Sequence, residues 1–91
     1  MNFIYQPNRI YAENQAGKLI AEITFPGRSE NTVDITHTFV DSSLRGQGIA
    51  NQMMEALVAK LRSEHKLAYP SCSYAQQWFE IHPETVDIQA D

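Results

Sequence analysis

The spacing of apolar residues changes abruptly in the middle of the chain, and this change constrains the fold more than any other feature. Across residues 32–40, apolar and polar side chains alternate, which predicts a β-strand. After a polar segment, apolar residues recur every four positions from Ile49 to Leu61, which predicts an amphipathic helix ending near His65. Because a helix that follows a strand crosses the sheet, the next strand is expected to run parallel to residues 32–40.

The segments on either side complete an α+β fold. Residues 9–13 and 18–25 are β-prone and are separated by a turn at residues 14–17, so they are expected to pair with each other antiparallel. Together with residues 32–40 they form a predicted meander. After the helix, residues 66–69 predict the short parallel strand, and a second helix is expected to begin with Ser73 as its N-cap and to stop before Pro83.

Length and composition limit the functions open to this chain. Its 91 residues are enough for one domain, 1–91, with a single core. A net charge of −4 argues against sequence-independent binding of nucleic acid or anionic lipid, and no apolar run is long enough for a membrane span. The single cysteine excludes an internal disulfide and favours a reducing, cytoplasmic location. Because no heptad seam is visible, a monomer is favoured, although the sequence leaves the oligomeric state open.

Histidine and cysteine spacing does not predict a metal site. His65, Cys72 and His82 lie seven and ten residues apart, which matches no compact zinc pattern. No metal is therefore expected.

The polar segment before the long helix contains the clearest candidate binding site. Arg45-Gly46-Gln47-Gly48 leads into the helix, and glycines allow the backbone to approach a ligand closely. The first amides of a helix lack partners and carry a partial positive charge, which suits a phosphate or diphosphate. The spacing is neither GxGxxG nor GxxxxGK[ST]. The alternative is a loop that merely starts the helix.

Residues 40–50 resemble the acetyl-CoA-binding motif of the GNAT N-acetyltransferase superfamily. Its Q/R-x-x-G-x-G/A pattern is filled here by Arg45, Gly48 and Ala50, whereas Ser42 stands where a proline is common. The similarity extends over about residues 9–84. It includes residues 35–40 and the Cys-Ser-Tyr-Ala segment at 72–75, which are similar to a short, single-domain branch without the N-terminal helices of larger members.

This resemblance implies a minimal GNAT-like α+β fold and an N-acetyltransferase that uses acetyl-CoA as cosubstrate and acts on an unidentified amine. The alternative is a non-catalytic acyl-CoA-binding or protein-interaction module. The implied cofactor-binding residues are Phe39, Val40, Arg45, Gly46, Gln47, Gly48, Ile49, Ala50 and Asn51.

Three side chains are candidates for catalysis, each with a structural alternative. Cys72 is expected near the acetyl thioester, where it would serve as a nucleophile, or else it is a small packing residue. His37 alternates with Ile35 and Phe39 and is therefore expected to face inward, either as a hydrogen-bonded core residue or as a general base. Tyr74 would protonate the departing CoA thiolate, or it packs beside Trp78. Direct transfer and an acetyl-Cys72 intermediate both remain open.

Overall fold

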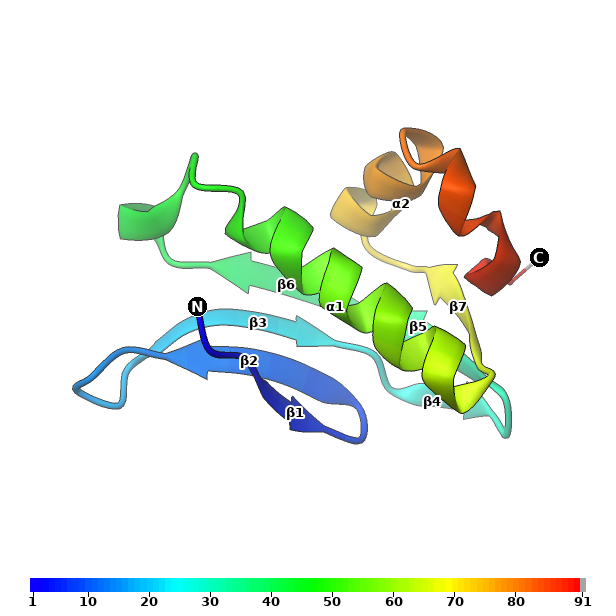
Figure 1. The fold of residues 1–91 in the computed structure, drawn as a ribbon, viewed down its shortest axis with the longest axis horizontal. Coiled ribbons are helices and arrows are strands. Elements are labelled where there is room, and N and C mark those ends of the chain that lie inside the picture. Colours follow the sequence, from blue (N-terminus) through cyan, green and yellow to red (C-terminus); the bar gives the residue numbers. More distant parts are fainter. Residues whose placement is uncertain (91) are drawn as a thin grey trace.

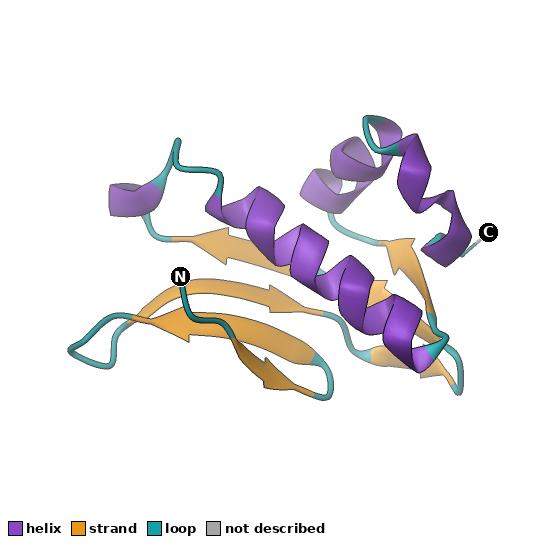
Figure 2. Cartoon of the chain, in the orientation of Figure 1, coloured by secondary structure: helices purple, strands orange, loops and turns teal. Residues whose placement is uncertain are grey.

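The computed structural model describes residues 1–90, which form two β-sheets, two α-helices and two short 3-10 helices (Figures 1 and 2). The strands are β1 (Ile4–Gln6), β2 (Arg9–Glu13), β3 (Leu19–Thr24), β4 (Gly27–Ser29), β5 (Thr32–Ile35), β6 (His37–Val40) and β7 (Leu67–Pro70). The helices are η1 (Ser42–Leu44), α1 (Ile49–Glu64), α2 (Ser73–Glu80) and η2 (Pro83–Ile88). The predicted α+β order of antiparallel strands, helix, parallel strand and second helix is confirmed.

The strands divide between two sheets. One sheet has the order β1-β2-β3-β6 with antiparallel neighbours, and the other has the order β4-β5-β7. β5 and β7 pair in parallel as far as Ile35 opposite Pro70, which confirms the predicted crossover. Beyond this pair, β6 belongs to the first sheet and runs in a different direction from β7 (Figure 1).

The predicted strand at residues 32–40 is interrupted at Thr36, which has no place in either ladder. Its N–H donates to the carbonyl of Thr24 at 3.1 Å, and the alternation of inward and outward side chains reverses there. His37 pairs with Thr24, whereas Thr38 pairs with the buried Ile23. The prediction that His37 faces inward is therefore wrong, because the extra residue moves it to the outer face of the sheet.

The core lies between α1 and the inner face of the four-stranded sheet. The four apolar residues that recur along α1 are all buried: Ile49, Met53, Leu57 and Leu61. Met54 and Val58 are buried beside them. They pack in one cluster with alternate residues of β2 and β3, including Ile10 and Ile23. α1 ends at Glu64, close to the predicted end near His65, and His65 is its C-cap with φ 56°. Among residues 1–90, no helix is long and apolar enough to span a membrane.

The C-terminal part packs as a layer beside β7. The N-cap of α2 is Cys72 and not the predicted Ser73, because the Cys72 sulfur accepts the N–H of Ala75 at 3.4 Å. Residues 84–91 are only weakly patterned, so no element is predicted there. In the structure η2 buries Ile88, and a bridge between Ala68 and Gln89 attaches this segment to β7.

Candidate active site

The loop between β6 and α1 is held in shape by Asp41. The Oδ2 atom of its carboxylate accepts the N–H of Ser43 at 3.1 Å and the Ser43 hydroxyl at 2.5 Å. These two hydrogen bonds, with help from Lys18, lower the pKa of Asp41 below its usual range. Asp41 is therefore a carboxylate at neutral pH, and it fixes the short η1 turn that leads into the glycines.

Two glycines then reverse the chain direction before α1. Gly46 and Gly48 have φ of 83° and 73°, a left-handed conformation that side chains with a Cβ rarely adopt. Gly48 is the N-cap of α1 and has no side chain to cap the helix. The amides of the first turn are therefore left for a ligand, with the positive end of the helix dipole behind them.

A cavity of about 200 Å³ connects this loop to α2. Its lining comprises Val40, Leu44, Arg45, Gly46, Gly48, Ile49, Ala50, Asn51 and Tyr74. Most of the predicted cofactor-binding residues thus lie together. Phe39 and Gln47 are not part of this lining, and Leu44 is an addition that the sequence analysis missed. Leu44 could have been identified from the sequence, because it is the single apolar side chain in the polar segment 41–48.

The edge of β6 next to this cavity has free backbone groups. The N–H of Asp41 donates to the carbonyl of Ile20 at 2.8 Å, so the antiparallel ladder directs alternate residues toward β3. By this alternation, the peptide groups of Thr38 and Val40 point away from β3. Within residues 1–90, β6 is the edge strand of its sheet, so no neighbouring strand occupies these groups.

Tyr74 and Cys72 approach the cavity region from α2. Tyr74 lines the cavity, and burial, followed by the charge of nearby Cys72, raises its pKa above the usual 10. Its phenol is therefore protonated at neutral pH. Cys72 is half-buried just after the last parallel pair, where its N–H donates to the carbonyl of Ile35 at 2.9 Å. Its side chain does not line the cavity itself.

His37 lies apart from these residues on the outer face of the sheet. Its side chain is 56% exposed, and its Nε2 lies 3.9 Å from Oε1 of Glu22. The other carboxylate oxygen of Glu22 binds Nε of Arg9 at 2.5 Å. The structure therefore places Tyr74 in the cavity next to the glycine loop and Cys72 two residues before it, at the N-cap of α2. His37 lies on the outer face of the sheet beside Glu22.

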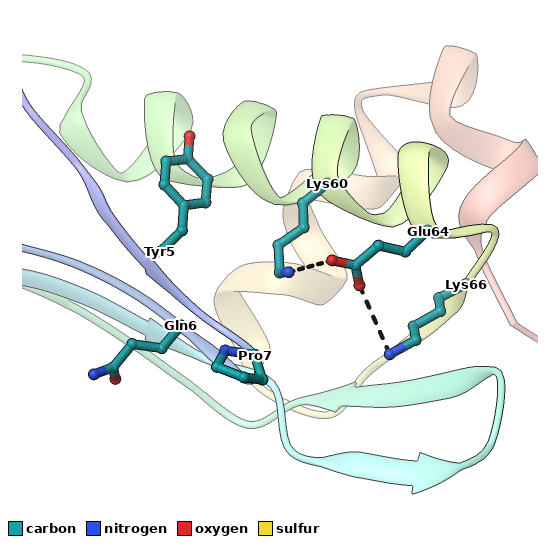
Figure 3. A pocket seen from close by; sticks show the side chains of 6 residues that line it. All are labelled: Tyr5, Gln6, Pro7, Lys60, Glu64 and Lys66. Atoms are coloured by element: carbon teal, nitrogen blue, oxygen red, sulfur yellow. Dashed lines mark hydrogen bonds and ion pairs between the residues drawn. The ribbon is translucent and has the colours of Figure 1, made fainter.

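A second depression, of about 390 Å³, lies near the far end of α1 (Figure 3). Figure 3 shows Lys60 and Lys66 directed toward Glu64, with the Lys66 ammonium 3.7 Å from its carboxylate. The sixteen-residue helix is about 24 Å long, and this depression lies at its C-terminal end, whereas the glycine loop lies at its N-terminal end. Because the Glu64 carboxylate partly neutralises the charges of both lysines, this depression suits an anion less well than the glycine loop does. Residues 1–90 also contain no cluster of three side chains suited to a metal ion.

The family model and the solved structures that match this chain point to the same family. Residues 9–88 match the family model described as GCN5-related N-acetyl-transferase. A GCN5-like protein of Staphylococcus aureus, solved by NMR, is 27% identical, with a TM-score of 0.82 over 98% of this chain and 87% of its own. No curated protein matches the chain significantly.

Two larger relatives share the fold and were solved with a cofactor. The GNAT N-acetyltransferase YhbS of Escherichia coli, in complex with CoA, is 24% identical over 64% of this chain, with a TM-score of 0.56. An acetyltransferase of Elizabethkingia anophelis with acetyl-CoA bound is 15% identical over 82% of this chain, with a TM-score of 0.61. The present chain covers only 35% and 51% of these two proteins.

Proposed function

Since the chain belongs to the GCN5-related N-acetyltransferase family, we propose that it transfers the acetyl group of acetyl-CoA to an amine. The observation that carries this proposal is the cavity between the glycine loop and α2. It combines left-handed glycines, unpaired helix amides and the free edge of β6. Relatives with the same fold were solved with CoA or acetyl-CoA bound.

We assign each part of CoA to the group that suits its chemistry. The diphosphate is anionic and fits the first-turn amides of α1 after Gly48, with Arg45 supplying a positive charge. The pantetheine arm contains two amides, which can pair with the edge of β6 at Thr38 and Val40 as an added strand would. The acetyl group would then lie where β6 and β7 separate, near Cys72.

In the transfer step the amine nitrogen attacks the thioester carbonyl. A C–N bond forms, the C–S bond breaks, and the amine loses a proton to water or to a general base. A free amide at the β6 edge would stabilise the oxyanion. Tyr74, kept protonated by burial, would donate its phenolic proton to the departing CoA thiolate.

Two routes to the product remain as proposals. In direct transfer the acceptor amine attacks acetyl-CoA, with His37 or a water taking the proton. In the covalent route the Cys72 thiolate first accepts the acetyl group and then passes it to the amine. Cys72 packs against the core two residues before the cavity-lining Tyr74, whereas the exposed His37 lies on the other face of the sheet, so Cys72 is the better placed of the two candidates.

The test combines binding, turnover and intact mass. We expect calorimetry to detect CoA binding, and mass spectrometry to detect acetylated product when acetyl-CoA is mixed with a panel of amines and peptides. Absence of CoA binding at millimolar concentration would overturn the proposal. Binding without acetylation of any amine or hydrolysis of acetyl-CoA would identify a non-catalytic acyl-CoA-binding module.

Cys72 variants separate the two routes. With acetyl-CoA alone, the covalent route predicts that the wild-type protein gains one acetyl group, which Cys72→Ser and Cys72→Ala both lack. Cys72→Ser provides the better control, because serine is a good N-cap for α2, whereas alanine loses the cap at a cost of about 1 kcal/mol. Wild-type turnover in both variants would leave direct transfer as the route.

A further inference from the structure

We propose that the hydrogen bond between Asn51 and Trp78 positions α2, and with it Tyr74 and Cys72, against the cofactor site. The inference rests on the proposed function, since it concerns how that site is assembled. Asn51 and Trp78 would be positioning residues, because Trp78 acts on the reacting groups only through the helix that carries them. The argument starts from the geometry of this bond.

The bond joins the indole of Trp78 to the side-chain amide of Asn51. Trp78 Nε1 donates to Oδ1 of Asn51 at 2.7 Å, while the amide nitrogen of Asn51 donates to Glu55 at 3.2 Å. Trp78 is only 4% exposed. A buried indole N–H without a partner is costly, so the position of Trp78 depends on the acceptor that Asn51 supplies.

Other contacts hold the indole ring in place against neighbouring residues of α2 and of the segment that follows it. Its ring stacks on His82 with centroids 3.8 Å apart, and the His82 Nδ1 lies 2.7 Å from the Trp78 carbonyl oxygen. Phe79 contacts the same ring edge-to-face at 5.9 Å. Because the indole cannot reorient freely, a change in its bond to Asn51 is transmitted to the backbone of α2.

The bond connects the two helices that line the proposed site, because Asn51 belongs to α1 and Trp78 belongs to α2. Asn51 lies in the first turn of α1 and lines the cavity, and Tyr74, one helical turn before Trp78, lines it from the other side. α2 packs chiefly against β7 and η2. Within residues 1–90, the Asn51–Trp78 bond is the one side-chain hydrogen bond that joins α1 to α2. It therefore sets the spacing between the diphosphate-binding turn and the catalytic candidates.

Trp78→Phe tests this role, because it keeps an aromatic ring and removes only the donor. We expect CoA affinity to stay within about threefold of wild type, since Trp78 does not line the cavity. We expect kcat to fall about 10- to 100-fold, because small displacements of reacting groups have effects of this size. The matched control is Gln77→Gly, which weakens the same helix at an exposed position but leaves the indole contacts and the bond, and whose kcat should stay near the wild-type value.

A second readout does not require turnover. The chain has a single tryptophan, so its indole N–H gives one resonance in a nitrogen–proton NMR spectrum. We expect CoA to shift this resonance, and Asn51→Ala to speed its exchange with solvent. In the double variant, Asn51→Ala should add little to the kcat loss of Trp78→Phe, because both remove the same bond.

The outcomes distinguish this inference from the proposed function. A wild-type protein that binds no CoA overturns both. If CoA binds and acetyl transfer occurs, but Trp78→Phe loses no more kcat than Gln77→Gly, then only the positioning role is overturned. If CoA binds without turnover, the indole resonance decides: a shift with CoA supports coupling between the two helices, and an unchanged resonance overturns it.

Discussion

At the scale of single residues, Gly48 offers the sharpest test of the proposed cofactor site. An added Cβ would meet nothing within 4 Å, so Gly48→Ala is destabilising only through its φ of 73°, by about 1 kcal/mol. The methyl group nevertheless occupies the surface where a diphosphate must approach the backbone. We expect calorimetry to show CoA affinity at least about tenfold weaker, while urea unfolding stays cooperative.

Gly17 provides the matched control for this prediction. It has φ 81°, an added Cβ would also meet nothing within 4 Å, and it lies in the hairpin turn between β2 and β3. Gly17→Ala should therefore cost a similar free energy of unfolding and leave CoA affinity unchanged. Equal affinity losses in both variants would show that general destabilisation, and not the approach of the diphosphate, explains the effect at Gly48.

Individual residues also show where sequence reasoning succeeds and fails. Arg45, Gly48 and Ala50 were identified because they fill the Q/R-x-x-G-x-G/A pattern of the GNAT motif that the loop resembles, and the structure brings them to one cavity. His37 was misplaced because a regular alternation over residues 32–40 contains no sign of the break at Thr36. One extra residue in a strand reverses every side chain after it.

At the scale of elements, η1 depends on the Asp41 carboxylate. Its pKa is lowered by the Ser43 hydroxyl and N–H, so the folded state favours the charged form. The resulting stabilisation is complete above the unfolded pKa, near 3.8, and is lost as the pH falls through the lowered folded value. Urea unfolding between pH 2 and 6 should show this loss in the wild type.

Asp41→Asn keeps an acceptor for Ser43 but cannot titrate, so its stability should vary less with pH across this window. Asp41→Ala removes the acceptor, and we expect faster amide hydrogen exchange in residues 43–48 together with weaker CoA binding. If both variants exchange as slowly as the wild type, η1 does not depend on this cap.

The elements themselves were predicted unevenly, for physical reasons. α1 was evident because a sixteen-residue helix repeats its apolar spacing several times. α2 is predicted correctly, but its N-cap is Cys72, one residue before the predicted Ser73. The reason is that serine is a common N-cap, whereas cysteine is a rare one. η2 is not predicted from the sequence, because Ile88 is buried by tertiary contacts and its segment has no repeating apolar pattern.

At the scale of the whole molecule, the proposed cofactor position bridges two sheets that the chain joins at Thr36. β6 lies in one sheet and β7 in the other, and α2 follows directly from β7. A ligand held by the β6 edge and by the α1 turn, with Tyr74 on the far side, restrains both sheets at once. Such a ligand binds the folded state and should stabilise the entire domain.

We therefore expect CoA to raise the midpoint of thermal unfolding, with about 2.7 kcal/mol of added stability at a free concentration 100 times the Kd. Hydrogen exchange should slow at Thr38 and Val40, whose amides point away from β3, and in the first turn of α1. The hairpin turn at residues 14–17 should exchange at an unchanged rate, because it opens locally. Slower exchange in the α1 turn alone, with Thr38 and Val40 unaffected, would mean that the ligand's anionic end binds without its arm pairing with β6.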